Sequence, residues 1–252
     1  EYNGQPFLKI ADVVSDIDES LDLVARTAEL LGQILVHYPF QLLNPPEKKL
    51  FKKGARYDRL GEVIQETVWL MFGLSAAIQY HIEVADEETF IKYINTFNRL
   101  TALIGPITYR SPISEGTLQP EGLLTSRMKK WFDIYPGQCA LPPRWFKDLE
   151  DFVQYLMGVK LFFYMDGDQV VPYDGTVGEF LEANVDSMDQ NQLRKLFDII
   201  LSCVWHFARF CRRFSTLEIR LFDLFKQNDW STLQWFVGTA RNIGPAEALV
   251  RD

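Results

Sequence analysis

Two stretches of the chain combine residue types that could hold an anionic ligand. Residues 108–131 read TYRSPISEGTLQPEGLLTSRMKKW, a turn-rich segment that runs into a predicted helix start and carries Arg127 and Trp131. Loops rich in Gly, Pro and Ser often hold ligands, and an arginine fork can bind a carboxylate through two hydrogen bonds. The other interpretation is a solvated helix arginine, as the neighbouring Lys129 and Lys130 suggest.

A second candidate pair is Glu218 with Arg220, in the segment TLEIR at residues 216–220. Strand alternation places both side chains on one face. A carboxylate beside a guanidinium, with a separate arginine loop, would suit a metal-nucleotide and an acidic substrate. A surface strand with a weak cross-strand ion pair is the plainer alternative.

A third candidate is the strand predicted at residues 75–84, SAAIQYHIEV, whose alternation puts Gln79, His81 and Glu83 on one face. Their amide, imidazole and carboxylate groups could contact a divalent ion or polar substrate groups. The alternative is an amphipathic strand with its polar face in water. Arg56 and Tyr57, in the turn GARY, belong either to an anion-facing turn or to the loop before a helix.

Bulk properties exclude several classes of protein. The 252 residues carry a formal net charge of −8 and are 47% hydrophobic, which predicts a globular chain that is neither a general nucleic-acid binder nor a binder of anionic membranes. Three cysteines without a CxxC pair, and no visible signal peptide, favour the cytoplasm. The motifs GxxxxGK[ST], GxGxxG and GxSxG are absent, which disfavours Walker-type ATPases, Rossmann enzymes and α/β-hydrolases.

The elements that must position these residues mix helices with strands. Strands are predicted at residues 6–14, 75–84, 159–165 and 216–223, with a hairpin turn at Asp166-Gly167-Asp168. Helices are predicted after Asp16 or Asp18 and Asp86, and over residues 60–71, 149–157, 190–213 and 230–241, with a short one after Gly175-Thr176. This order predicts an α+β domain with an antiparallel or mixed sheet that cups the site, with helices behind it.

Four motifs in this order resemble the glutamate–cysteine ligase family, the bacterial and plant-type carboxylate–amine ligases. They are GARYDRL, SAAIQYHIEV, the stretch from RSPISEG to SRMKKW, and STLEIRLFD. The resemblance covers roughly residues 6–240 and implies a glutamine-synthetase-like fold. It also implies that ATP phosphorylates the γ-carboxylate of glutamate and that an amine attacks the acyl phosphate, with Mg²⁺ on the phosphates.

The resemblance assigns roles by position. Arg56, Tyr57, His81, Arg127 and Trp131 would contact the amino-acid and amine substrates. Metal would be bound by Gln79 and Glu218, while Arg220 would contact the ATP phosphates and act in catalysis.

One departure from the family shapes the functional expectation. The family's Glu-x-Glu strand, which supplies metal ligands, is not found in this sequence, and His81 stands where an asparagine is usual. We therefore expect a single domain over residues 1–252 that is incomplete at its N-terminus. Two functions follow: an ATP-dependent ligase, or a catalytically incomplete subunit or pseudoenzyme. In the second case a partner chain would complete the sheet near residues 6–14.

Overall fold

The structure is a computed structural model that describes residues 4–36, 38, 53–64, 76–108, 112–114, 116–118, 137–220, 222 and 230–251. The helices are α1 Ile10–Leu30, α2 Ala55–Ile64, α4 Glu87–Thr108, α6 Leu149–Met157, α7 Val177–Asn184, α8 Gln190–Ser202, α9 Ser231–Arg241 and α10 Ile243–Arg251. The strands are β1 Tyr80–Glu83, β2 Ile113–Ser114, β3 Thr117–Leu118, β4 Cys139–Ala140, β5 Lys160–Asp166, β6 Gln169–Thr176, β7 Trp205–His206, β8 Ala208–Cys211 and β9 Thr216–Ile219. Short 3₁₀ turns follow α7 and β8.

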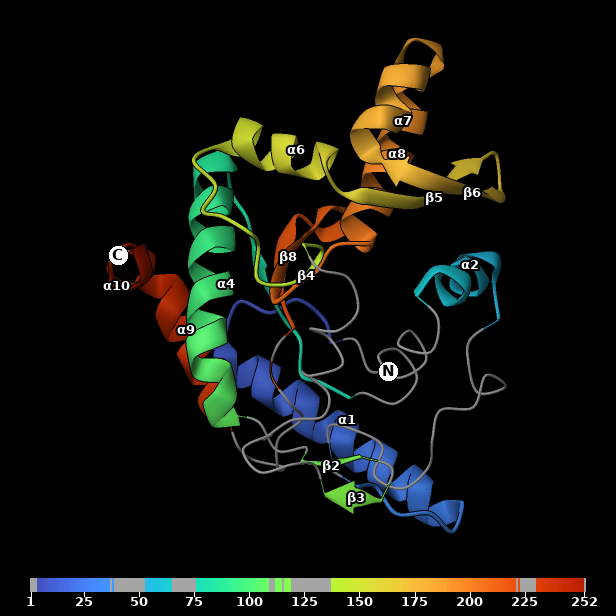
Figure 1. Ribbon diagram of the computed structural model, residues 1–252. Helices are drawn as coiled ribbons and strands as arrows, with labels where there is room; N and C mark the ends of the chain where they lie inside the picture. Colours follow the sequence, from blue (N-terminus) through green and yellow to red (C-terminus); the bar gives the residue numbers. More distant parts are fainter. Residues whose placement is uncertain are drawn as a thin grey trace.

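The sheet that carries the predicted site residues has the strand order β1-β9-β8, with antiparallel neighbours. One face of it is apolar, because Tyr80, Leu217, Ile219 and Ala208 are buried in the main core. In the same core lie α4 and α9, which run side by side in Figure 1. The hydroxyl groups of Tyr80 and Thr232, on β1 and α9, are hydrogen-bonded at 2.8 Å. The opposite face carries the polar residues of the strands.

Helix α4 begins where the sequence predicts. The Asp86 carboxylate accepts the backbone N–H of Thr89 at 2.7 Å, the side-chain cap expected at a helix start. Phe90, Ile94 and Phe97 follow at helical spacing and are buried against the sheet. The predicted cap thus fixes the start of the helix that supports the β1-β9-β8 sheet.

The β5–β6 hairpin also matches its prediction. Gly167 has φ +57°, so the tight turn occupies the left-handed region in which glycine carries no steric penalty. Helix α7 follows through a capping box, in which Thr176 accepts the N–H of Glu179 and Glu179 accepts that of Thr176. Figure 1 shows α6 and α7 at the open end of this hairpin, opposite its turn.

Two predictions are wrong in element type. Residues 6–14 do not form a strand, since α1 already begins at Ile10. Ile10, Val13 and Val14 follow the i, i+3, i+4 spacing of a helix and pack together against the core. The unpaired strand edge predicted at residues 6–14 is therefore not there.

The predicted helix over residues 190–213 ends at Ser202, and the apolar run after it forms β7 and β8. The backbone N–H groups of Trp205 and Phe207 bond to the carbonyls of Gln138 and Ala140, at 2.6 and 3.0 Å. Pairing with β4 is parallel, so the structure combines parallel and antiparallel pairs. An apolar run of this length suits either element, and here the tertiary partner decides.

The fold class is α+β, as predicted. Helices from 149–157 and 231–241 agree with the sequence, and α10 extends the chain beyond the last predicted helix to pack beside α4. Within the described residues, no helix is both long and apolar enough to cross a membrane.

Candidate functional site

Three strands bring His81, Glu218 and Arg209 into one row across the polar face of the β1-β9-β8 sheet. Glu218 is the direct cross-strand partner of His81 on β1 and of Arg209 on β8. Arg209 donates from Nε to Glu218 Oε2 at 2.5 Å, and His81 Nε2 lies 4.0 Å from Glu218 Oε1. The row is a product of sheet register, because direct partners share a face and lie about 5 Å apart at Cβ.

Arg220, the residue directly after β9, completes the cluster. Its Nε lies 3.7 Å from Glu218 Oε1, and the exposed fractions of the two side chains are only 8% and 5%. One buried carboxylate is thus faced by two guanidinium groups, Arg209 and Arg220. With His81 neutral, the described side chains Arg209, Arg220 and Glu218 sum to a charge of +1, a balance that suits an added anion better than an added cation.

The pKa shifts agree with this charge balance. Burial raises the pKa of Glu218, but the positive charges of Arg220 and Arg209 outweigh it and leave that pKa below its ordinary value. For His81, burial lowers the pKa; Glu218 opposes this, while Arg209 and Arg220 add to it. The net pKa of His81 is lowered, so its imidazole is neutral at pH 7. Its Nδ1 lies 3.0 Å from Thr216 Oγ1.

Gln79 is exposed and directly precedes β1. Continuing the β1–β9 register by one residue sets it opposite Arg220, on the face of His81. Glu83 is exposed and pairs with Thr216, further along the strand from Arg220. The strand register thus sets Gln79, His81 and Glu218 on one face of the sheet.

Arg56 and Tyr57 lie in the first turn of α2, with the Arg56 guanidinium 5.8 Å from the Tyr57 ring centre. Arg56 Nη2 donates to the Ser202 carbonyl at a long 3.5 Å. Burial raises the pKa of the Cys203 thiol, and the positive charges of Arg56 and Arg209 partly oppose this. Arg56 thus contacts the C-terminal end of α8 through the Ser202 carbonyl.

Helix α2 is held in place by Arg59. Its Nε donates to the Phe162 carbonyl at 3.1 Å, and its Nη2 donates to the Tyr173 carbonyl at 3.4 Å. Both acceptors belong to the β5–β6 hairpin, so Arg59 ties the helix that carries Arg56 to that hairpin. The other two predicted substrate residues, Arg127 and Trp131, lie outside the described residues.

Arg209 is the site residue that the sequence prediction missed. Residues 190–213 look helical, and in a helix Arg209 would have no fixed relation to Glu218. The signal that could have found it is the alternation Ala208-Arg209-Phe210, which sets a charged residue between two apolar ones. In the structure these alternate residues pair with Ile219, Glu218 and Leu217.

The described residues do not by themselves fit a divalent metal ion. Nowhere among them do three or more His, Cys, Asp or Glu side chains gather in a metal-binding group. Glu218 is the one carboxylate of the cluster, and Arg209 already occupies its Oε2. Mg²⁺ prefers several oxygen ligands, so the cluster fits a phosphate or carboxylate group better than a bare cation.

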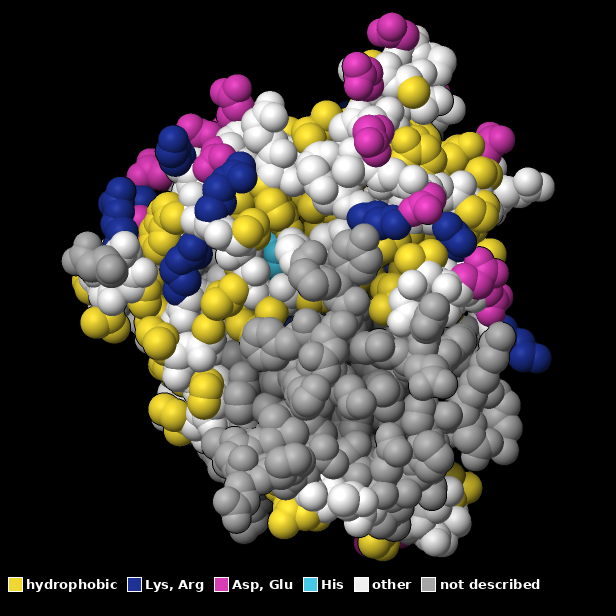
Figure 2. All heavy atoms as spheres, viewed as in Figure 1, with side chains coloured by type: hydrophobic (Ala, Val, Ile, Leu, Met, Phe, Trp, Pro, Cys, Tyr) yellow, Lys and Arg dark blue, Asp and Glu magenta, His cyan; other side chains and the backbone are white. Residues whose placement is uncertain are grey.

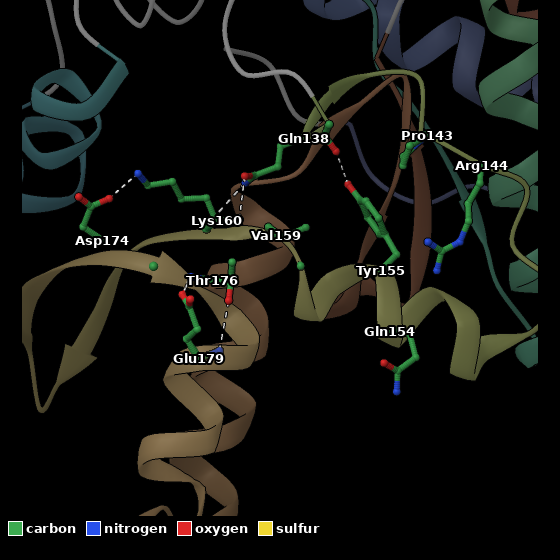
Figure 3. A pocket seen from close by; sticks show the side chains of 13 residues that line it. Gln138, Pro143, Arg144, Gln154, Tyr155, Val159, Lys160, Asp174, Thr176 and Glu179 are labelled. Carbon is green, nitrogen blue, oxygen red and sulfur yellow. Dashed lines mark hydrogen bonds and ion pairs between the residues drawn. The ribbon is translucent and has the colours of Figure 1, made fainter.

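A cavity of about 490 Å³ lies elsewhere, between α6, the β5–β6 hairpin and the start of α7. None of the predicted site residues lines it. Figure 3 shows its Lys160 pointing to Asp174 and its Tyr155 hydroxyl pointing to the Gly137 carbonyl. Figure 2 shows Lys and Arg side chains interspersed with Asp and Glu over the part of the surface formed by α6, α7 and the hairpin.

Comparison with known proteins supplies the family. No curated protein matches the chain. The family model described as glutamate-cysteine ligase family 2 (GCS2) matches residues 1–244 of the 252, a span that includes α2, all three strands of the β1-β9-β8 sheet and the turn-rich segment. On this match, the chain belongs to glutamate-cysteine ligase family 2.

Proposed function

We propose that the protein is an ATP-dependent carboxylate–amine ligase that forms a γ-glutamyl-type amide through an acyl phosphate. Family membership supports this class of reaction. The observation that carries it is the buried Glu218 carboxylate, faced by Arg209 and Arg220 on the polar face of the sheet. Both substrates of the first step, ATP and a dicarboxylic acid, are anions that such a cluster can hold.

In this proposal a carboxylate oxygen of the acid attacks the γ-phosphorus of ATP, and ADP leaves. The amine nitrogen then attacks the acyl carbon, phosphate leaves, and the nitrogen loses a proton. Arg220, with Arg209 beside it, neutralises the transferring phosphoryl group. Glu218 holds the two guanidinium groups in place, so they need little reorganisation when charge develops.

The remaining predicted residues hold the substrates. Arg56 and Tyr57 on α2, together with His81, face the acid and the amine, and Arg127 and Trp131 complete that pocket. Arg127 is the sharpest test of this part, because a lysine cannot reproduce a two-bond guanidinium fork. We expect Arg127→Lys to weaken binding of the acid by more than about ten-fold. Equal affinities in calorimetry would assign Arg127 to a solvated helix surface.

If Mg²⁺ accompanies ATP, it would add neutralising charge to the phosphates. Gln79 and Glu218 stay its predicted ligands, although the charge balance around Glu218 points to an anion. Carboxylates outside the described residues would have to complete a metal site.

The direct test is ADP release with glutamate and a panel of amines, including cysteine. We expect release that requires both the acid and an amine, and a new amide product in mass spectrometry. ADP release that stays at background with every pair would contradict the ligase proposal.

A second candidate function is a catalytically incomplete subunit or pseudoenzyme that binds a partner chain or ligand. The observation in its favour is that the described residues contain no group of three metal-ligating side chains. Mg-ATP should raise the melting temperature if the chain binds the nucleotide, because a ligand of the folded state stabilises it. Stabilisation without turnover would select the second candidate.

A further inference from the structure

Helix α4 holds two buried asparagines, Asn95 and Asn98, that each grip a peptide backbone far away in sequence. Asn95 donates from Nδ2 to the Phe146 carbonyl at 2.7 Å and accepts the Phe146 N–H at 2.9 Å. Asn98 does the same with Ala208: Nδ2 donates to its carbonyl at 2.9 Å, and Oδ1 accepts its N–H at 2.9 Å. The exposed fractions of Asn95 and Asn98 are 1% and 0%.

The two hydrogen bonds between Asn98 and Ala208 lie on the outer edge of β8, the edge that faces away from β9. In an antiparallel ladder, hydrogen-bonded pairs alternate with pairs whose N–H and C=O groups point away from the partner. Arg220 N–H bonds to the Phe207 carbonyl at 2.8 Å, so the next pair, Ala208 with Ile219, points its backbone groups outward. The Asn98 amide therefore takes the place that a further strand would occupy at Ala208. The two hydrogen bonds from Asn98 thus fix the position of β8 at Ala208.

The residue after Ala208 is Arg209, whose Nε lies 2.5 Å from the Glu218 carboxylate. We propose that Asn98 is a positioning residue that sets the Arg209 guanidinium on Glu218 by fixing the edge of β8. This inference rests on the proposed function in one respect, namely that the Arg209–Glu218 pair belongs to the anion-binding cluster.

Asn95 provides the control, because it makes the same pair of distant backbone bonds from the same helix, while Asn98 Nδ2 makes one more bond, to the Ile94 carbonyl of its own helix at 2.7 Å. Its target, Phe146, lies in the loop before α6 and is not a strand neighbour of any residue in the cluster. If Asn98 only stabilised the fold, removal of either amide would have the same consequences. If Asn98 positions Arg209, only its removal changes the cluster.

The experiment compares Asn98→Ala with Asn95→Ala, using the arginine Nε–H signals in a ¹⁵N–¹H spectrum. The Arg209 signal is assigned by its loss in Arg209→Lys. We expect both alanine variants to lower the urea midpoint, because each leaves a buried N–H and C=O without a partner. We expect only Asn98→Ala to shift or broaden the Arg209 Nε–H signal. An unchanged Arg209 signal, or an equal change in both variants, would overturn the inference.

If Asn98→Ala does not fold, Asn98→Ser replaces it, because serine retains one hydrogen-bonding group. The Arg209 Nε–H signal is measured in that variant in the same way. The steady-state kinetics of the folded variants are then measured. We expect Asn98 variants to raise the KM for ATP or for the acid by about five-fold while kcat changes less, and Asn95→Ala to change neither. An inactive wild-type protein would refute the proposed ligase and leave the spectroscopic result to decide on Asn98.

Discussion

Both the polar face of the β1-β9-β8 sheet and the cavity beside α6 gather ion pairs, but they balance charge differently. On the sheet, the single Glu218 carboxylate is faced by Arg209 and Arg220, and its side chain is 5% exposed. At the cavity, Lys160 is paired with Asp174 and Arg144 with Asp151. Asp174 is 80% exposed, so water already screens that pair.

Under the proposed function, concavity alone does not identify the anion site. The cavity is large enough for a small ligand, yet each of these two lining cations already has its own carboxylate. On the sheet, the described Arg209 and Arg220 side chains share the single Glu218 carboxylate, which is 5% exposed, and a charge interaction is stronger where there is little water. The proposed function therefore predicts that an anionic substrate gains more at the cluster than at the cavity.

The largest expected effect comes from Glu218→Gln. Removal of the carboxylate charge takes from Arg209 and Arg220 the counter-charge that Glu218 provides. We expect the free energy of unfolding to fall by about 3–5 kcal/mol, the usual result of breaking a buried pair by one partner. Urea denaturation followed by circular dichroism measures it.

Asp174→Asn is the matched change at the cavity. It removes one exposed partner of Lys160, so the urea midpoint should not move measurably. A similar loss of stability in Glu218→Gln and Asp174→Asn would contradict the proposed difference between the sheet cluster and the cavity.

The next effect concerns His206, which bonds through Nε2 to the hydroxyl of the cavity residue Tyr155 at 3.0 Å. Burial lowers the pKa of His206 to about 4. The unfolded chain therefore binds a proton on this histidine between pH 6.5 and 4 while the folded chain does not. Stability is fully present above about pH 6.5 and falls as the pH drops towards 4, by about 3 kcal/mol in total from this group.

His206→Phe should remove that contribution and flatten the stability profile between pH 6.5 and 4. Urea midpoints of both proteins at several pH values provide the comparison. If stability depended on pH in the same way in both proteins, protonation of His206 in the folded state would not carry this free-energy cost.

A smaller effect is expected from Thr176→Ala, at the other wall of the cavity. It removes the side-chain half of the α7 capping box and should cost about 1 kcal/mol of stability. ATP affinity, measured by calorimetry, should not change. Weaker ATP binding by this variant would indicate that the nucleotide binds at the cavity.

Elements with local signals were predictable from the sequence. The Asp86 cap, the glycine turn of the β5–β6 hairpin and the Thr176 cap each depend on a few neighbouring residues. The errors fall where the local signal is ambiguous. Residues 10–14 suit a strand in composition, but Ile10, Val13 and Val14 have helical spacing. The run that starts at Cys203 continues a helix in pattern, yet β4 pairs with its backbone.

The site was predictable only in part for the same reason. His81, Glu218 and Arg220 stand out because each lies in a clearly alternating segment. Arg209 joins them through the pairing of β8 with β9, and the misassigned helix concealed that pairing. The grip of Asn98 on Ala208 joins residues 110 positions apart, and no local pattern indicates it.

The central claim is that the Arg209–Glu218–Arg220 cluster, and not the cavity, binds the anionic substrates. Calorimetric titration of Mg-ATP into the wild-type protein, Arg209→Lys and Arg144→Lys tests it most directly, since each variant keeps its charge and loses only the guanidinium fork. We expect Arg209→Lys to weaken binding by more than about ten-fold and Arg144→Lys to leave it unchanged. Unchanged binding by Arg209→Lys, or a greater loss in Arg144→Lys, would contradict the account.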